Sequence, residues 1–341
     1  MTDILKDIPQ YTRKDFVSDQ EVKWCAGCGD FSILAAIQNT LPILGISKEK
    51  FVFVSGIGCS SRFPYYVDTY GFHGIHGRAA AIATGVKLAN PELSVWIMSG
   101  DGDSMAIGGN HFIHILRRNI NVNYILFNNQ IYGLTKGQYS PTTALGKVTK
   151  TSPYGTIEHP FKPGELAMGA EGTFYARTSD TNLGQMKEVF EEAAKHRGTS
   201  FVEVLQNCVI FNNKTHGDIT AKETREDNQI YLKQGEKMLF GAEMNKGLVL
   251  NGLKLKIVTI GEDGYTEDDI LMHDAEDEDP TMAFLLARMA LPNFPVAMGV
   301  LRAYKTKVYD DLMLQQIEEV KSKSKIKNMT DLINSGNTFE L

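Results

Sequence analysis

Short apolar runs that stop abruptly at Gly, Asn or Asp are the main pattern along this chain. Residues 51–54, 95–98, 122–127 and 201–205 are such runs, and each leads into a turn that carries polar or cysteine side chains. Continuous apolar, β-branched runs are typical of strands buried on both faces of a parallel sheet. The pattern therefore predicts four buried strands, each followed by a turn with candidate site residues.

Helical spacing fills the stretches between these strands. Apolar residues recur every three or four positions in residues 33–41, 78–88, 110–117 and 185–196. Strand and helix thus alternate, which predicts an α/β fold with a mostly parallel sheet and helices on both faces. Ligands of such sheets bind outside the carboxyl ends of the strands, where the predicted turns converge.

The remaining segments lack this regular alternation. Residues 133–156 are rich in Gly, Pro, Ser and Thr, which predicts a long loop over the site or against a partner. We expect one α/β domain over residues 1–215 and a C-terminal extension, residues 216–341, that packs on this domain or on a partner subunit. Residues 261–280 are dense in Asp and Glu and residues 305–341 are polar, which is typical of solvated surface.

Composition narrows the classes of partner. The chain has 341 residues, is 43% hydrophobic and carries a net charge of -6, so it can bury a full core but lacks the basic footprint of a nucleic-acid or anionic-membrane partner. No apolar run approaches the roughly 20 residues that cross a bilayer, and residues 1–20 lack the apolar centre of a signal peptide. We therefore expect a cytoplasmic protein whose four cysteines are metal ligands or catalytic thiols.

A candidate diphosphate site follows two of the strands. Gly100-Asp101-Gly102 comes after one run, and Asn128-Asn129 comes after the next. A diphosphate bound with Mg²⁺ needs closely approaching backbone and hard oxygen ligands, which glycine, Asp101 and Asn129 provide. Neighbouring parallel strands would bring these side chains together. We also expect a helix beginning near Gly108 to point its N-terminus at the phosphates.

Four cysteines form a second candidate site. Cys25 and Cys28 make a close pair, while Cys59 and Cys208 each lie in a turn after a predicted strand. Such a set is compatible with structural zinc, with a dithiol plus two bystanders, or with an iron-sulfur cluster. The spacing leaves all three interpretations open.

The Gly-Asp-Gly and Asn-Asn pair resembles the motif of thiamine diphosphate enzymes. That resemblance implies a metal held by Asp101, Asn129 and the carbonyl of Ile131. A more specific resemblance, to beta subunits of 2-oxoacid:ferredoxin oxidoreductases, covers residues up to about 213. It is carried, in the family's order, by Trp24-Cys25-Ala26-Gly27-Cys28-Gly29, Gly56-Ile57-Gly58-Cys59-Ser60, His73-Gly74-Ile75-His76-Gly77-Arg78-Ala79, Gly100-Asp101-Gly102-Asp103 and Tyr132-Gly133-Leu134-Thr135-Lys136-Gly137-Gln138.

This resemblance implies a cofactor set and its contacts. Cys25, Cys28, Cys59 and Cys208 would hold one 4Fe-4S cluster. Thiamine diphosphate and Mg²⁺ would contact Gly58, Cys59, Ser60, His76, Gly100, Asp101, Gly102, Asp103, Asn129, Ile131, Gly133, Leu134 and Thr135. The chain departs from the family at Asn207, where members often have Pro, and at Lys136, where some have Gly. Neither departure removes a ligand.

The implied reaction is oxidative decarboxylation of a 2-oxoacid to an acyl-CoA, with electrons passing through the cluster to ferredoxin. Arg62 and His73 are the candidate catalytic residues, and Arg62 would favour the second carboxylate of 2-oxoglutarate. The chain has room for one thiamine-binding domain, so a larger alpha subunit would complete the site in a heterodimer or heterotetramer. A pyruvate-specific member, a non-oxidative decarboxylase with zinc, and a zinc-stabilised binding subunit are the alternatives.

Overall fold

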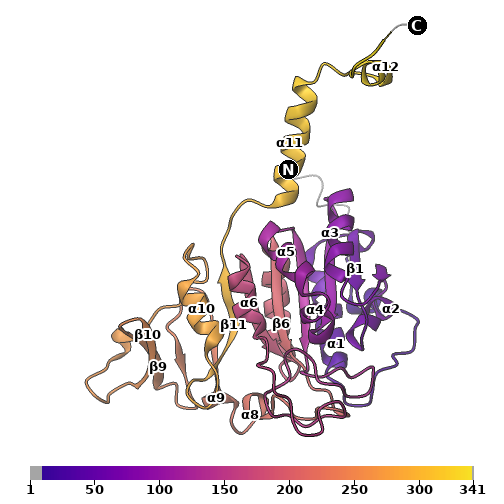
Figure 1. The fold of residues 1–341 in the computed structure, drawn as a ribbon. Helices are drawn as coiled ribbons and strands as arrows, with labels where there is room; N and C mark the ends of the chain where they lie inside the picture. Colours follow the sequence, from indigo (N-terminus) through magenta and orange to yellow (C-terminus); the bar gives the residue numbers. More distant parts are fainter. Residues whose placement is uncertain (1–9, 340–341) are drawn as a thin grey trace.

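An eight-stranded sheet forms the centre of the protein (Figure 1). The computed structural model describes residues 10–339. The strand order is β2-β1-β3-β4-β6-β5-β11-β7. The first six of these strands pair in parallel, whereas β11 runs antiparallel to β5 and parallel to β7. The bounds are β1 (Phe51–Ser55), β2 (Tyr70–His73), β3 (Ser94–Gly100), β4 (Val122–Asn128), β5 (Phe174–Ser179), β6 (Thr199–Leu205), β7 (Gln229–Leu232) and β11 (Val296–Ala303).

The four strands predicted from apolar runs are confirmed as β1, β3, β4 and β6. Every residue of β1, β4 and β6 is buried, which is why their sequences are mostly apolar, and polar residues such as Glu203 in β6 are paired with buried partners. The prediction missed the two edge strands β2 and β7 and the interior strands β5 and β11. The last two share one feature. Both contain a buried arginine, Arg177 and Arg302, that interrupts the apolar run and finds its partners only in the folded chain.

Two hydrophobic cores lie on the two faces of the sheet. Alternate residues of β1 divide between them, with Val52 and Val54 in one core and Phe51 and Phe53 in the other. The first core is covered by α3 (Ala79–Ala89), α5 (Gly109–Arg118), α6 (Pro163–Gly169) and α10 (Thr281–Arg288), and the second by α1 (Asp30–Thr40) and α7 (Leu183–Lys195). The four predicted helices are therefore confirmed as α1, α3, α5 and α7.

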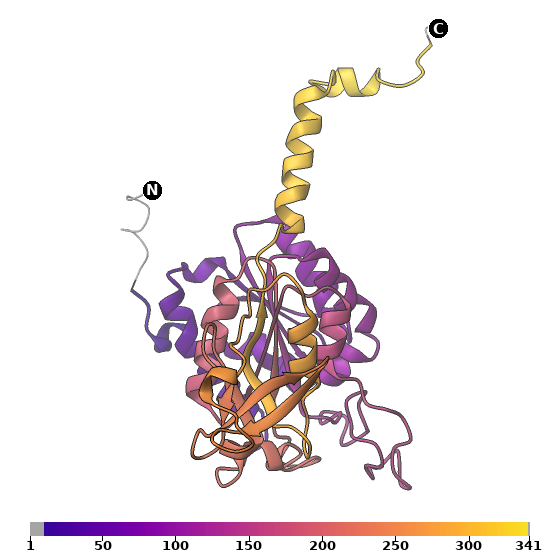
Figure 2. The same cartoon turned by 90° about the vertical axis from the view of Figure 1, so that its left-hand side faces the viewer.

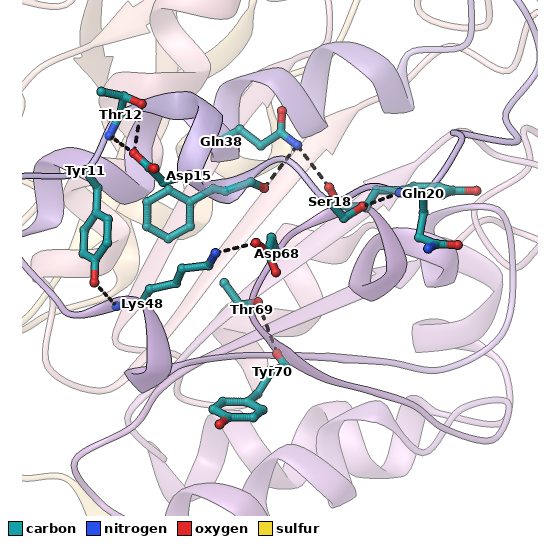
Figure 3. Close-up of polar contacts among 12 residues, drawn as sticks. Tyr11, Thr12, Asp15, Ser18, Gln20, Gln38, Lys48, Asp68, Thr69 and Tyr70 are labelled. Carbon is teal, nitrogen blue, oxygen red and sulfur yellow. Dashed lines mark hydrogen bonds and ion pairs between the residues drawn. The ribbon is translucent and has the colours of Figure 1, made fainter.

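The N-terminal segment is tied across α1 and the turn that follows α2 (Phe63–Tyr66). The buried side chain of Gln38 donates from Nε2 to the carbonyl of Tyr66 at 3.1 Å and to that of Phe16 at 3.5 Å. Lys48 forms an ion pair with Asp68 nearby (Figure 3). The Gln38 contacts join Phe16 of the N-terminal segment to α1 and to the end of α2.

The part of the chain after residue 215 is continuous with the main sheet. It contributes β7 and β11 to that sheet and adds a three-stranded antiparallel sheet of order β10-β9-β8. The bounds are β8 (Leu239–Phe240), β9 (Lys246–Asn251) and β10 (Lys254–Thr259). After β11 the chain leaves the body beside Asn119 and Asn121, and α11 (Tyr309–Lys323) and α12 (Met329–Ile333) project away from it (Figures 1 and 2).

Short helices complete the fold. They are the 3-10 turns Arg13–Phe16, Leu41–Leu44, Lys48–Lys50, Ser60–Arg62 and Glu267–Asp269 and the helices α4 (Asp101–Met105), α8 (Gly217–Thr220) and α9 (Arg225–Asn228). Within residues 10–339, no helix combines the length and apolar character required to cross a membrane.

Candidate functional site

A cavity of about 470 Å³ lies at the carboxyl ends of β1, β3 and β4. Its walls come from the turns that follow these three strands, together with His76 from the turn before α3. Every residue predicted to contact the diphosphate or its metal lines this one cavity, namely Gly58, Cys59, Ser60, His76, Gly100, Asp101, Gly102, Asp103, Asn129, Ile131, Gly133, Leu134 and Thr135. The parallel register of the strands therefore brings the separate motifs together.

The buried carboxylate of Asp103 holds two of these turns in position. Its Oδ1 accepts hydrogen bonds from the backbone N–H of Ile57 at 3.1 Å and of Gly77 at 2.7 Å. Its Oδ2 accepts one from the hydroxyl of Ser99 at 2.5 Å. His76 Nδ1 lies 2.9 Å from Oδ1, although its orientation is not that of a hydrogen bond. Asp103 thus fixes the backbone of two turns that border the cavity.

The helix predicted to begin near Gly108 is confirmed as α5, whose N-cap is Gly108, but the helix that begins at the cavity is α4. Strand β3 ends at Gly100, which is the N-cap of α4, and residues 100–103 line the cavity. The N-terminal residues of α5, which begins at Gly109, are not among the residues that line this cavity. The sequence pattern did not predict α4, because a five-residue helix that begins within Gly100-Asp101-Gly102 is too short to show an apolar period.

Asp101 and Asn129 offer the oxygen donors expected of a magnesium site. Asp101 is buried, and burial raises the pKa of its carboxyl to about 6 against the opposing effect of hydrogen bonds from Ser140 and Thr142. The Asn129 side chain donates from Nδ2 to Gln206 Oε1 at 2.7 Å, which fixes the orientation of its amide. Asn129 Oδ1 accepts from the N–H of Ile131 at 3.1 Å and keeps a second lone pair. These donors fit a hard cation.

The four cysteines surround a second cavity of about 260 Å³, and all of them line it. A Cβ built at Gly133 would lie 3.4 Å from Cys208 Sγ and 3.6 Å from Cys59 Sγ, so no side chain separates these sulfurs at that point. Gly133 lines both cavities. In the part of the chain that the structure describes, no three His, Cys, Asp or Glu side chains lie close enough together to hold a single metal ion.

Electrostatically, the cysteine cavity is suited to a cationic group. Burial, together with the carboxylate of Asp30, raises the pKa of the Cys59 thiol to about 12 and raises that of Cys28 as well. Asp30 is fully buried, and neither of its carboxylate oxygens has a hydrogen-bond partner among the described residues. Buried acids without a counter-charge favour their protonated forms, and a metal that replaces the proton removes that penalty.

The two candidate catalytic residues lie outside the diphosphate cavity. Arg62 lines the cysteine cavity, and its Nη1 donates to the carbonyl of Lys23 at 2.8 Å. His73 lies on the edge strand β2, exposed, with Nδ1 3.0 Å from the hydroxyl of Tyr65. The structure thus brings Arg62 beside the cysteines and leaves His73 away from both cavities.

Sequence reasoning missed several residues at this site. Tyr132 lines the diphosphate cavity, and its hydroxyl donates to the carbonyl of Gly102 at 3.0 Å. Ser140 and Thr142 reach Asp101 from the loop after β4. Tyr132 was already inside a recognised motif, but a run of hydroxyl residues in a loop gives no signal of its partner, because the contact spans about 40 positions of sequence.

Comparison with known proteins agrees with this geometry. The family model described as thiamine pyrophosphate enzyme, C-terminal TPP binding domain, matches residues 56–204, which contain the turns of the diphosphate cavity. Fold, cavity and family match together define the class: an α/β domain that binds thiamine diphosphate.

Relatives of known function narrow the class further. The chain is 52% identical over 305 residues to the 2-oxoglutarate oxidoreductase subunit KorB of Mycobacterium tuberculosis, a match that covers 89% of this chain and 81% of the relative. It is 44% identical over 222 residues to subunit beta of 2-oxoacid:ferredoxin oxidoreductase 2 of Aeropyrum pernix, with coverages of 65% and 70%. The chain belongs to the family of beta subunits of 2-oxoacid:ferredoxin oxidoreductases, and is thus part of an oxidoreductase.

A solved structure extends the likeness to almost the whole chain. The 2-oxoglutarate:ferredoxin oxidoreductase from Magnetococcus marinus, with 2-oxoglutarate, coenzyme A and succinyl-CoA bound, matches with a TM-score of 0.78 and 32% identity over 98% of both chains. The resemblance to the family therefore continues past residue 213, where the motifs recognised in the sequence end.

Proposed function

We propose that this chain is the cofactor-carrying beta subunit of an enzyme that oxidatively decarboxylates 2-oxoglutarate to an acyl-CoA and passes the electrons through a 4Fe-4S cluster to ferredoxin. The observation that carries the proposal is that the diphosphate cavity and the cysteine cavity adjoin, since Cys59, Asn129, Gly133 and Leu134 line both. Two redox partners bound in these cavities would therefore be neighbours, and at Gly133 no side chain would lie between them.

The diphosphate cavity would hold thiamine diphosphate through Mg²⁺. When bound, thiamine diphosphate supplies the electron sink for decarboxylation of a 2-oxoacid. The chain would supply Asp101, Asn129 and the carbonyl of Ile131 to the metal, and the backbone of residues 100–102 to the phosphates. Tyr132 and the buried Asp103 would keep the surrounding turns in place and limit access of water.

The cysteine cavity would hold the 4Fe-4S cluster on Cys25, Cys28, Cys59 and Cys208. Zinc bound by four thiolates requires all sulfurs at about 2.3 Å from one point. All four cysteines line one cavity of about 260 Å³. Membership in a family whose names include ferredoxin as the electron acceptor supports an iron-sulfur cluster over zinc at these thiols.

Among 2-oxoacids, 2-oxoglutarate has the strongest support. Both the Mycobacterium tuberculosis relative and the Magnetococcus marinus structure carry 2-oxoglutarate in their names, and the latter also binds coenzyme A. In this chain, Arg62 at the rim of the cysteine cavity would be the cation for the second carboxylate of the substrate. The same residues would serve the reverse, carboxylating direction.

A larger alpha subunit would complete the active site in a heterodimer or heterotetramer. Thiamine chemistry needs a carboxylic acid against the aminopyrimidine ring, and no glutamate is among the described residues that line the diphosphate cavity. The membership in a family of beta subunits supports the same arrangement. Ferredoxin, which is generally acidic, would dock on a local basic patch.

Anaerobic purification tests this proposal directly. The complete enzyme should be brown, contain iron and sulfide, and bleach with dithionite. With 2-oxoglutarate and coenzyme A it should reduce ferredoxin, and the chain without its alpha partner should not. Colourless protein with stoichiometric zinc would instead support the non-oxidative decarboxylase. A higher rate with pyruvate than with 2-oxoglutarate would assign the chain to a pyruvate-specific enzyme of the same family.

A further inference from the structure

Two hydroxyl groups from the loop after β4 converge on the carboxylate of Asp101. Ser140 Oγ and Thr142 Oγ1 each lie 2.5 Å from Asp101 Oδ2. Ser140 is 2% exposed and Thr142 3% exposed, so both bonds are shielded from water. Neither residue lines the diphosphate cavity. They contact the candidate metal ligand from the side away from the cofactor.

The loop segment that carries these hydroxyls is anchored to the end of β4. Thr143 Oγ1 donates to the carbonyl of Gln130 at 2.7 Å and accepts from the N–H of Ser140 at 2.7 Å. Thr142 Oγ1 also lies 3.1 Å from Asn128 Oδ1. The segment 140–143 therefore joins the carboxyl ends of β3 and β4, the two strands that carry the oxygen donors.

We infer that Ser140 and Thr142 are positioning residues for the metal: they hold Asp101 by Oδ2 so that Oδ1 is directed at the Mg²⁺. This inference rests on the proposed function, since it assigns a role toward the metal of that site. A carboxylate that binds a metal with one oxygen is oriented by hydrogen bonds to the other, and charge-assisted bonds of this length are the strong kind. Both donors come from one loop, so metal binding and the conformation of that loop are coupled.

The remainder of the loop supplies a control residue that does not contact Asp101. Beyond Thr143 it runs over the surface at the carboxyl edge of the sheet, and Tyr154 and Ile157 are almost fully exposed (Figures 1 and 2). Within this part of the loop, the hydroxyl of Thr156 donates a hydrogen bond to the carbonyl of Ala144 at 2.7 Å. Thr156 does not contact Asp101, which makes it a matched control for loop packing.

Metal affinity is the test that separates positioning from packing. Binding of Mn²⁺ in place of Mg²⁺, with thiamine diphosphate saturating, can be measured by electron paramagnetic resonance on the complete enzyme. Ser140→Ala and Thr142→Val should each weaken Mn²⁺ binding about tenfold or more, the usual cost of losing a group that orients a metal ligand. Thr142→Ser, which keeps the hydroxyl, and Thr156→Ala should bind Mn²⁺ like the wild type.

The outcomes are distinguishable. Unchanged Mn²⁺ affinity in Ser140→Ala and Thr142→Val contradicts the inference while leaving the proposed function intact. An equal loss in Thr156→Ala also contradicts it, because loop packing would then explain the effect. Failure of the wild type to bind Mn²⁺ with thiamine diphosphate removes the proposed cofactor site itself, and the inference with it. Thermal unfolding of each variant without metal identifies any that fails to fold.

Discussion

Glu203 on β6 accepts a hydrogen bond from the side chain of Asn128 on β4 at 2.7 Å. Both residues are buried. Glu203 also accepts from Arg177 Nε at 2.9 Å and from the hydroxyl of Tyr175 at 2.6 Å. The first asparagine of the recognised pair therefore belongs to a buried ionic network that supports the strand ends, whereas its neighbour Asn129 lines the cavity.

Glu203→Gln should strongly destabilise the fold. Removing one charge of a buried pair leaves the Arg177 guanidinium without its counter-charge, which costs about 3–5 kcal/mol. Urea unfolding of the wild type and the variant measures the difference. The double variant Glu203→Leu with Arg177→Met removes both charges and should lose less than Glu203→Gln alone. A double variant that is less stable than the single one would argue against this account.

Gly102→Ala should impair cofactor binding without unfolding the chain. A Cβ at Gly102 would lie 2.2 Å from Cε1 of Tyr132, so the tyrosine ring must move within the cavity that both residues line. We expect weaker binding of thiamine diphosphate in calorimetric titration. Gly85→Ala is the control, because Gly85 is exposed on helix α3, its added Cβ meets nothing within 4 Å, and the substitution should stabilise by about 1 kcal/mol or less. Equal cofactor affinity in the Gly102 variant and the wild type would refute the prediction.

Gly133→Val should lower the iron content of the purified enzyme. The added side chain begins 3.4 Å from Cys208 Sγ and 3.6 Å from Cys59 Sγ and extends into the space between them. Iron and acid-labile sulfide per chain, together with visible absorbance, measure cluster loading. Gly133→Ala adds only the first of these atoms and should lose less iron. Full cluster loading in the valine variant would show that the cluster does not occupy this space.

The stability of the chain should fall between pH 6.5 and pH 4 because of His196. Burial lowers the pKa of this imidazole to about 4 from 6.5, and its Nε2 lies 3.0 Å from the hydroxyl of Thr173. The unfolded chain takes up the proton first as the pH falls, so stability is fully present above pH 6.5 and is lost towards pH 4. The loss should reach up to about 3 kcal/mol. Denaturant unfolding at several pH values should show a shallower pH dependence for His196→Gln, and an identical dependence would exclude His196 as the cause.

Arg62→Ala should change the choice of substrate. Its guanidinium lines the cysteine cavity and is held by the carbonyl of Lys23 at 2.8 Å. If Arg62 binds the second carboxylate of 2-oxoglutarate, its loss should lower kcat/KM for 2-oxoglutarate more than for pyruvate, measured as ferredoxin reduction by the complete enzyme. Arg62→Lys keeps the charge but not the paired hydrogen bonds, so its kcat/KM for 2-oxoglutarate should lie between those of the wild type and Arg62→Ala. Unchanged relative rates would make Arg62 a structural residue.

The sequence by itself determined the strands whose two faces are buried and the turns that follow them. Mostly apolar runs predicted β1, β3, β4 and β6, because strands buried on both faces are composed largely of apolar side chains. The same runs located Gly100-Asp101-Gly102, Asn128-Asn129 and Cys59 at one edge of the sheet. Family motifs then identified the residues that line the diphosphate cavity, since a cofactor fixes residue type and local spacing together.

Only the tertiary structure decided which distant groups support that site. Ser140 and Thr142 reach Asp101 from a loop without periodicity, and Arg177 becomes acceptable inside a strand only once Glu203 lies beside it. Strand β11 pairs with β5, which is far from it in sequence, and its buried Arg302 likewise finds its hydrogen-bond partners only in the folded chain. A buried polar group is stable only with its partner in place, and that partner is chosen by packing in three dimensions, which local sequence does not encode.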